Sequence, residues 1–299
     1  MENNFYIEAL KQNRVVGIYG IKYLDDKLKH ILLGDLIIIG ARSGAGKSSL
    51  AEMIALNNVK AGYPVHLFSL ENFTNDTKVK KMYRIFTEMT GRYDISIIDF
   101  ISGCFDMDKY AKELDEARKR TDELFKDLLI TYRQPNYTVD SLIKDMEKTV
   151  KENGTRLIIL DHLDYIEKDN KREDDISHMT ELMKTIRSLQ DEFKVAVVAF
   201  SHLRKNPPMF KKSLIPTIDE FTGAASKIRE ATGVIMIAPD DEENDKRQSN
   251  EKITIFAIQK SRWIGYANNY GMLFYNTKTG EYEQKYEVFY LYKGDKVKV

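Results

Sequence analysis

Residues 40–48, with the sequence Gly-Ala-Arg-Ser-Gly-Ala-Gly-Lys-Ser, have the composition of a loop that binds phosphate groups. An apolar run precedes the loop and a helical pattern follows it, which argues against an accidental glycine-rich turn. Small residues let backbone N–H groups converge on an anion, and a helix N-terminus adds positive potential. Lys47 would reach the β- and γ-phosphates of a nucleotide, and Ser48 would ligate Mg²⁺. The predicted phosphate-binding residues are Ala41, Arg42, Ser43, Gly44, Ala45, Gly46, Lys47, Ser48 and Ser49.

Two acidic residues follow apolar runs elsewhere in the chain. The run at residues 156–160 ends at Asp161, and a carboxylate beside a phosphate loop holds Mg²⁺ through its water shell. Glu71 follows a second run, at the carboxyl edge of the predicted sheet, where ligands of open α/β folds bind. A carboxylate there can orient and deprotonate an attacking water. On its position alone, Glu71 could equally be an ordinary surface residue.

Further candidates are a histidine and two groups of cations. His202 ends an apolar run, where it can hydrogen-bond a γ-phosphate and register its loss, with a solvent-facing histidine as the alternative. Lys260 and Arg262 end another strand and can stabilise charge that develops on a nucleotide, with an ordinary pair of surface cations as the alternative. The segment 204–212 is the best local candidate for contacting a phosphodiester backbone, with a solvated basic loop as the alternative. Its cations are Arg204, Lys205, Lys211 and Lys212.

Short apolar, β-branched runs predict the strands that position these residues. They lie at residues 35–39, 65–70, 156–160, 195–200, 233–238 and 252–258. Near-continuous hydrophobic runs separated by helical stretches are typical of a mostly parallel α/β sheet that is covered on both faces. Apolar residues at helical spacing predict helices at 48–60, 140–152 and 178–193. Aromatic and apolar residues at 270–275 and 286–292 predict a terminal β-hairpin.

Three segments fall outside this α/β core. Residues 1–16 have the features of a short N-terminal arm, which separates them from a domain at 17–299. Residues 76–135 form a highly charged excursion with a helix predicted at 109–128. Residues 240–252, which are all polar, predict a solvated loop between two strands.

Composition excludes several functional classes. Lys and Arg total 46, as do Asp and Glu, so any nucleic-acid contact must come from a local patch rather than from a global positive field. The single cysteine, Cys104, excludes an intrachain disulfide. Because the chain has neither an apolar run near the ~20 residues of a membrane span nor a signal-peptide pattern, we expect no membrane partner. The expected location is the cytoplasm, or the host cytoplasm for a phage-encoded protein.

Taken in order, these motifs resemble the C-terminal motor domain of the replicative hexameric helicases, both the DnaB type and the phage and Twinkle type. The resemblance extends from Gly20 to about Tyr282. The matching segments are LGDLIIIGARSGAGKS at 33–48, FSLE at 68–71, LDHL at 160–163, SHLR at 201–204, EFTGAASKIREATGV at 220–234, KSR at 260–262 and GMLFYNTKTG at 271–280. The combination in this order is far more specific than any single motif.

The resemblance implies a RecA-like P-loop ATPase that uses ATP and Mg²⁺ to move on single-stranded DNA and unwind duplex DNA during replication. It implies that Glu71 is the catalytic base and His202 the phosphate sensor. Lys260 and Arg262 would reach the ATP of the neighbouring subunit, which requires a ring, by resemblance a homo-hexamer. Residues 204–212 would lie in the DNA-binding loop that faces the central channel. Primase and loader proteins are the further partners that it suggests.

The chain departs from the family pattern at Thr222, where the family usually has Arg, and at Thr232, where it usually has Asp. No primase or collar domain is recognisable ahead of the motor. Residues 1–16 are a candidate arm that packs on the next subunit, with a frayed terminus as the alternative. Two other functions stay open: a RecA- or KaiC-like ATPase of recombination or regulation, and a replisome accessory ATPase that does not unwind DNA. The catalytic set of Glu71, Asp161 and His202 argues against an inactive enzyme.

Overall fold

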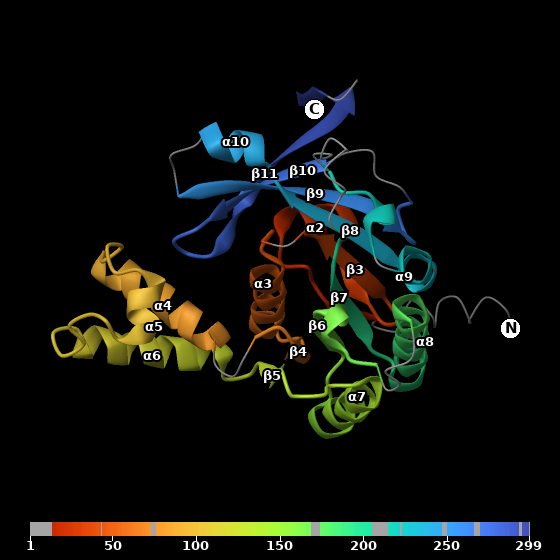
Figure 1. Ribbon diagram of the computed structural model, residues 1–299, viewed down its shortest axis with the longest axis horizontal. Helices are drawn as coiled ribbons and strands as arrows, with labels where there is room; N and C mark the ends of the chain where they lie inside the picture. The colour runs from red at the N-terminus through yellow and green to blue at the C-terminus, as the bar shows by residue number, and fades with distance from the viewer. Residues whose placement is uncertain are drawn as a thin grey trace, which may run out of the picture.

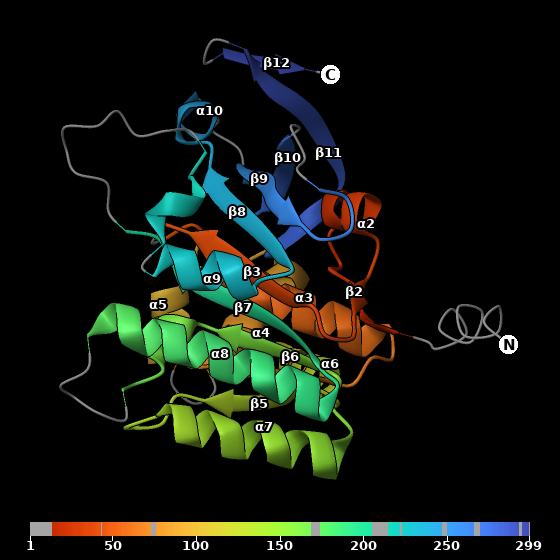
Figure 2. The ribbon, with the colours of Figure 1, turned by 90° about the vertical axis from the view of Figure 1, so that its right-hand side faces the viewer.

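A ten-stranded sheet with helices on both faces dominates the computed structural model (Figures 1 and 2). The residues that the structure describes are 14–42, 44–72, 76–168, 174–204, 215–221, 223–246, 250–265, 270–292 and 295–298. The spatial order of the strands is β12-β11-β10-β9-β8-β3-β7-β6-β4-β5. The predicted α/β fold with a large, mostly parallel sheet is therefore confirmed.

Six of these strands, from β8 to β5 in the spatial order, run parallel to one another. Their bounds are β3 Leu36–Ala41, β4 Val65–Ser69, β5 Leu129–Tyr132, β6 Leu157–Asp161, β7 Ala196–His202 and β8 Gly233–Pro239. Parallel strands end at the same edge of a sheet, so the residues that follow β3, β4, β6 and β7 meet there. We call this edge the phosphate end, because β3 leads there into the phosphate loop. The other edge of the sheet, where β3 begins, is called the opposite end.

The remaining four strands extend the sheet in antiparallel fashion. Their bounds are β9 Glu251–Ser261, β10 Tyr270–Asn276, β11 Glu281–Tyr292 and β12 Asp295–Lys298. The predicted hairpin is present as β10 and β11. The strand predicted at 252–258 is present as β9, which pairs antiparallel with β8 within the mostly parallel sheet. The short connection at 240–250 explains this, since a parallel neighbour needs a crossover of about a dozen residues or more.

Two apolar layers cover the faces of the sheet. On one face α7 and α8 bury residues such as Leu142 and Met183 against Ile38 of β3. On the other face α3 buries Leu50 and other residues against β3 and its neighbours. The helices around the sheet are α2 Lys22–Leu28, α3 Lys47–Lys60, α7 Val139–Asn153, α8 Asp175–Phe193 and α9 Ala224–Glu230, with the short 3₁₀ turns η1 Leu163–Tyr165 and η2 Ile218–Glu220. The predicted helices at 48–60, 140–152 and 178–193 are thus confirmed.

The excursion at 76–135 is a three-helix insert that projects from the side of the sheet (Figure 1). It consists of α4 Asp76–Thr90, α5 Ile97–Ser102 and α6 Ala111–Phe125, followed by β5. Phe86, Phe100 and Ala117 form a small core of its own, separate from the two layers of the sheet. The helix predicted at 109–128 corresponds to α6. The sequence analysis missed β5, whose four residues are too few and too mixed to give a strand pattern.

The prediction of a solvated loop at residues 240–252 is wrong in part, because Asp241–Lys246 forms helix α10. Asp240, which is buried, precedes this helix, and its Oδ1 accepts the backbone N–H of Glu243 at 3.4 Å. Acidic residues in the first turn and Lys246 at the end complement the helix dipole. Local charge placement therefore stabilises a helix where composition alone indicates a loop.

The N-terminal region enters the described structure at Arg14 and forms β1 Val15–Gly17, which pairs with β2 Ile31–Leu32. Most of the predicted arm, residues 1–13, lies outside the described residues. Thr232, at the start of β8, exchanges hydrogen bonds of 3.0 and 3.2 Å with the backbone of Leu36. Thr222 lies outside the described residues. Among the helices that the structure describes, none has the length and apolar character to cross a membrane.

Candidate functional site

The phosphate loop joins the end of β3 to the start of α3. Its backbone turns at Gly44 and Gly46, whose φ angles of 80° and 84° lie in the left-handed region that glycine adopts without strain. Gly46 directly precedes α3, so the free N–H groups of the first helical turn face the same space. Ser43 lies outside the described residues. The other predicted phosphate-binding residues lie on this turn or at the start of α3, an arrangement that suits an anion.

Lys47 is buried at the base of the loop, where its Nζ lies 2.9 Å from Nδ1 of His202. The parallel register of β3 and β7 aligns Ala41 with His202, which brings the histidine beside the loop. Burial lowers the pKa of the Lys47 ammonium, and the charges of nearby carboxylates oppose that shift. Burial also lowers the pKa of His202, with further contributions from His162 and Lys47. A neutral His202 can therefore accept a hydrogen bond from the ammonium group.

Asp161 ends β6 at the phosphate end and is 1% exposed. Its Oδ1 has no hydrogen-bond partner, and burial raises the pKa of the carboxyl group to about 6 although a hydrogen bond with Ser48 opposes the rise. A buried, partnerless carboxylate oxygen beside a hydroxyl group is the hard oxygen donor set that Mg²⁺ prefers. These two residues therefore fit a Mg²⁺ ion that also contacts a bound phosphate.

Glu71 lies two residues beyond β4, on the same side of the loop. The backbone N–H of Glu71 donates to the carbonyl of Asp161 at 3.3 Å, and that of Leu70 to the same carbonyl at 2.7 Å. The Glu71 carboxylate accepts a hydrogen bond from Ser48 Oγ at 3.3 Å, and its side chain is 38% exposed. A carboxylate that reaches both the candidate metal ligand and solvent is placed to act on a water molecule.

The structure adds Asp164, on η1, which the sequence analysis did not single out. Its carboxylate accepts the backbone N–H of His202 at 2.8 Å and lies 3.2 Å from Nδ1 of His162. It also lies 3.5 Å from Nζ of Lys227, a fully buried residue that donates to Ser201 Oγ at 2.6 Å. Burial alone would raise the pKa of Asp164, but the contacts with His162 and Lys227 hold it well below its usual range. Asp164 thus fixes the backbone position of His202.

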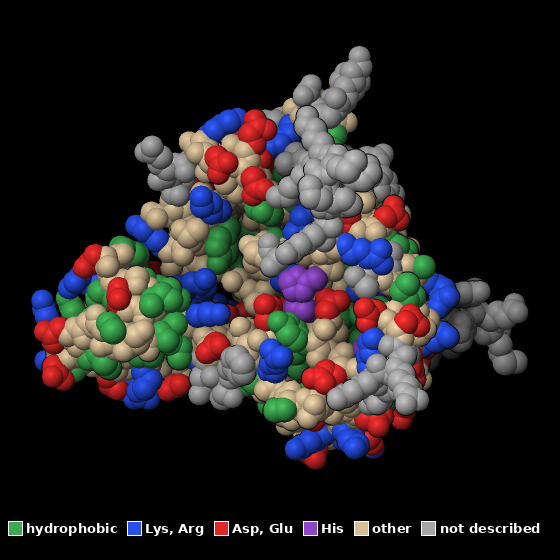
Figure 3. All heavy atoms as spheres, viewed as in Figure 1, with side chains coloured by type: hydrophobic (Ala, Val, Ile, Leu, Met, Phe, Trp, Pro, Cys, Tyr) green, Lys and Arg blue, Asp and Glu red, His purple; other side chains and the backbone are tan. Residues whose placement is uncertain are grey.

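A histidine pair completes this end of the sheet. The rings of His162 and His202 meet edge to face at 4.2 Å; His162 is buried and His202 is partly exposed. Figure 3 shows histidine atoms at the surface near the middle of the face, between acidic groups. Ligand atoms of Glu71, His162 and His202 all lie within 4.8 Å of one another, a set of a kind that transition metals bind. The ammonium group of Lys47 beside His202 opposes a second cation there.

Lys260 and Arg262 lie at the opposite end of the sheet. Ser261 pairs with Gly233, and Gly233 pairs with Ile37 near the start of β3. The six residues from Leu36 to Ala41 span about 16 Å of strand, so neither cation is near the phosphate loop of its own chain. Lys260 Nζ donates to the carbonyl of Ile228, whereas Arg262 is exposed. The structure therefore does not bring these two predicted site residues together with the others.

The basic segment is described only at its first residue. Arg204 is exposed two residues after the end of β7, whereas Lys205, Lys211 and Lys212 lie outside the described residues. Arg42, in the phosphate loop, directs its guanidinium group to Glu220 rather than to the phosphate site. Any contribution of Arg42 to phosphate binding would therefore come from its backbone.

A pocket of about 490 Å³ adjoins the phosphate loop. The loop residues Gly44 to Gly46 form one wall, and α10 with the β9, β10 and β11 strands forms the others. Tyr275 and Tyr282 line it, with ring centroids 5.1 Å apart. Aromatic rings beside a phosphate site provide a surface for the base of a nucleotide.

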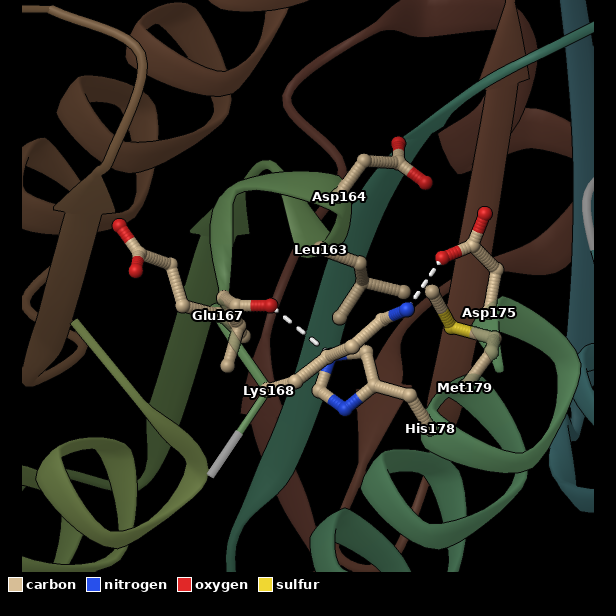
Figure 4. A pocket seen from close by; sticks show the side chains of 8 residues that line it. Leu163, Asp164, Glu167, Lys168, Asp175, His178 and Met179 are labelled. Atoms are coloured by element: carbon tan, nitrogen blue, oxygen red, sulfur yellow. Dashed lines mark hydrogen bonds and ion pairs between the residues drawn. The ribbon is translucent and has the colours of Figure 1, made fainter. Parts of the chain in front are cut away.

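A second pocket, of about 520 Å³, lies between η1 and α8 (Figure 4). Within it Lys168 Nζ lies 2.6 Å from Asp175, and His178 Nε2 lies 2.9 Å from the carbonyl oxygen of Ile166. Asp164 and Glu167 give the pocket further acidic groups. Since its one described lysine is already paired with a carboxylate, this pocket does not suit a phosphate group.

Comparisons with known proteins agree with this geometry. The family model of the DnaB-like helicase C-terminal domain matches residues 18–283. The chain is 23% identical over 256 residues to the replicative DNA helicase DnaB of Treponema pallidum, which covers 85% of this chain and 54% of that protein. It is 22% identical over 209 residues to DnaB of Rickettsia prowazekii, with coverages of 66% and 41%. The chain thus spans about half the length of these relatives.

Solved structures support the same fold. A DnaB-like replicative helicase, solved to study its interactions with primase, superposes with a TM-score of 0.76 at 17% identity over 94% of this chain and 66% of that one. The ATPase domain of G40P gives 0.73 at 17% identity, with 94% and 96% coverage. A KaiC-like protein of Pyrococcus horikoshii gives 0.52 at 14% identity, with 95% and 99% coverage. With a family model that matches most of its length, this chain belongs to the DnaB-like helicase C-terminal domain family.

Proposed function

We propose that this chain is the motor of a ring helicase, which hydrolyses ATP with Mg²⁺, translocates on single-stranded DNA and separates duplex DNA during replication in the cytoplasm. One observation carries the proposal. Groups that can bind phosphate and activate water gather at the phosphate end, while the candidate charge-stabilising cations, Lys260 and Arg262, lie about 16 Å away along the strands. A complete site then requires a second subunit.

In the proposed mechanism, Lys47 and the loop backbone bind the β- and γ-phosphates of ATP. Ser48 and Asp161 would hold Mg²⁺, which when bound neutralises charge on the phosphates. Glu71 takes a proton from the attacking water, and its partly exposed side chain supports this role. His202, held by Asp164 through its backbone N–H, detects whether the γ-phosphate is present.

Exposed apolar side chains next to Lys260 and Arg262 support a contact between subunits at this place. Trp263 and Ile264, directly after Arg262, are 55% and 48% exposed. On the insert, Ile98 and Ile101 of α5 are 68% and 56% exposed, and hydrophobic side chains gather there in Figure 3. Exposed apolar patches of this kind are typical of protein contacts. In a homo-hexamer, these two surfaces would belong to the faces through which neighbouring subunits meet, and residues 1–16 would add an arm to the contact.

Nucleic-acid binding is assigned to Arg204 and to the lysines at 205, 211 and 212. Arg204 is exposed directly after His202 and Leu203, so the proposed phosphate sensor and the proposed DNA contact are neighbours in the chain. A balanced overall charge makes a local group of cations the natural contact for the DNA backbone. Primase and a loader are the proposed protein partners, since primase binding is described for a structurally similar helicase.

Electron microscopy of the full chain with a slowly hydrolysed ATP analogue and a single-stranded oligonucleotide tests the proposal, together with ATP turnover with and without the oligonucleotide. We expect closed rings and DNA-stimulated turnover. Filaments would favour a recombination-type ATPase, and nucleotide binding without stimulated turnover would favour an accessory role. A chain that stays monomeric with both ligands would contradict a site shared between subunits.

A further inference from the structure

Arg42 and Glu220 form a two-pronged ion pair between the phosphate loop and η2. Arg42 Nη2 lies 3.0 and 2.9 Å from the two carboxylate oxygens of Glu220, and Nε lies 3.2 Å from Oε2. The two side chains are only 16% and 9% exposed. An arginine that grips a carboxylate in this way fixes orientation as well as distance, and water screens the pair little.

Glu220 also ties together the two chain segments that flank residues 205–214. Its backbone carbonyl accepts the N–H of Arg204 at 2.7 Å, on the side where the basic segment begins. Its carboxylate Oε1 accepts the N–H of Thr217 at 3.0 Å, on the side where the chain returns. Leu203 and Phe221 pair antiparallel next to these bonds. One residue therefore holds both flanks and, through Arg42, the phosphate loop.

The contact between these flanks and β3 leaves no free space. The N–H of Leu203 donates to the carbonyl of Ala41 at 3.2 Å. Phe221 is fully buried beneath Gly40, where an added Cβ would lie 2.5 Å from the phenyl ring. Close-packed groups of this kind move together, so a displacement of residues 40–42 must also displace the flanks at 203–204 and 220–221.

We infer that Glu220 is a positioning residue that, through its ion pair with Arg42, couples the nucleotide state of the phosphate loop to the affinity of Arg204 for nucleic acid. This inference rests on the proposed function, because it requires ATP at one site and a nucleic acid at the other. Coupling between two ligands is reciprocal, so the nucleotide must change oligonucleotide affinity by the same factor as the oligonucleotide changes nucleotide affinity. A brace that only stabilised the fold would not alter that factor.

The test measures the affinity of the full chain for a fluorescent single-stranded oligonucleotide, with the ATP analogue and with ADP. For the wild type we expect the two affinities to differ about tenfold, within the usual range of such couplings. In Glu220→Gln, which keeps the acceptor for Thr217 but loses the charge, the ratio should fall to within about twofold of one. ATP turnover without oligonucleotide should stay at the wild-type value. The matched control is Glu281→Gln, which breaks a 3.1 Å pair with Lys81 and should leave the ratio unchanged.

Arg42→Lys provides a second variant, which keeps the positive charge but cannot form the two-pronged contact. Arg42→Lys should bring the ratio of the two oligonucleotide affinities part of the way toward one. If Glu220→Gln does not fold, the ratio of Arg42→Lys alone tests the coupling. A wild-type ratio in either variant, with wild-type thermal unfolding, overturns the assignment of Glu220 and leaves the proposed function intact. A wild type that neither binds the oligonucleotide nor hydrolyses ATP overturns the proposed function instead.

Discussion

The two ends of the central sheet differ in how far their charged groups are already paired. At the phosphate end, Lys47 contacts His202, and Asp164 lies beside the buried cation Lys227. At the opposite end, Lys260 donates to the backbone carbonyl of Ile228. Within the described part of the chain, neither Lys260 nor Arg262 forms an ion pair through its side chain. One end is thus organised within the chain, whereas the other has cations available for a different molecule.

This difference indicates how the work of one enzyme can be divided between copies of a chain. Groups that must hold a nucleotide in every state gain from a fixed, partly buried network. Cations that are needed only during hydrolysis gain from arriving across a subunit contact, since their approach can then depend on the state of the ring. Substitutions at the two ends of the sheet test this difference.

Lys47→Ala should have the largest effect, because it removes the ammonium group that the proposed mechanism places on the β- and γ-phosphates. Turnover should fall on the order of 1,000-fold or more, measured as phosphate release at saturating ATP. The control is Lys60→Ala, at the exposed far end of the same helix, which should turn over ATP at the wild-type rate. Turnover by Lys47→Ala above about a tenth of wild type would remove this residue from the mechanism.

Arg262→Ala should reduce turnover by about 1,000-fold, the range of other arginines lent to a nucleotide. Binding of a fluorescent ATP analogue should change little, because Arg262 lies at the opposite end of its own sheet. Mixing this variant with Lys47→Ala, under conditions of subunit exchange, creates interfaces in which both residues are intact and should restore part of the activity. Arg156→Ala, an exposed arginine that precedes β6 at the same end, is the control. Mixtures that stay inactive would count against a shared site.

Lys227→Met tests whether the phosphate end depends on its buried pair. Without the ammonium group, Asp164 would hold the His202 backbone less firmly, and turnover should fall about tenfold. The free energy of unfolding should drop by about 2 kcal/mol, less than for a fully buried pair because the Asp164 side chain is 25% exposed. Urea denaturation measures the loss, and Lys227→Met with Asp164→Asn should recover part of it. Wild-type stability and turnover in Lys227→Met would show that the pair is dispensable.

Ile98→Asp should have the smallest effect on chemistry. The side chain is 68% exposed on α5, so stability should be unchanged, while the concentration for half-assembly should rise about tenfold if this surface is a subunit contact. Sedimentation at several protein concentrations measures the shift. Ile176→Asp, an equally apolar residue that is 59% exposed on α8, is the matched control. Identical assembly of the two variants would exclude the insert from the contact.

Much of the sheet and one part of the site follow from local sequence. The apolar runs that become β3, β6 and β7 are long enough to indicate strands, and the order of parallel strands then brings their ends together. This is why Lys47, Asp161 and His202 could be predicted as neighbours. The direction of β9 could not be read from its own residues, because a buried antiparallel strand has the same apolar pattern as a parallel one.

Contacts between residues that are far apart in the chain could not be predicted from a single sequence. Lys227 stands in the polar stretch Ser-Lys-Ile-Arg, which is typical of a helix surface, and nothing local indicates that its side chain is buried beside Asp164. Asp164 gives only a weak signal in the sequence, as a second acidic residue three positions after Asp161. The Arg42 and Glu220 pair joins residues 178 positions apart, and both have the polar character of ordinary surface groups.

The separate core of the three-helix insert has a consequence for how this chain can evolve. Phe86, Phe100 and Ala117 pack against one another rather than against the sheet. The contacts of the insert with the β10–β11 hairpin include an ion pair from Lys81 to Glu281, a hydrogen bond from Arg84 to Tyr275 and a cation–π contact between Lys278 and Tyr93. Substitutions within this small core therefore leave the packing around the phosphate loop intact, whereas Phe125 at the end of α6 belongs to the core on the α3 face of the sheet. The residues of this core can therefore vary in evolution while the residues around the phosphate loop stay the same.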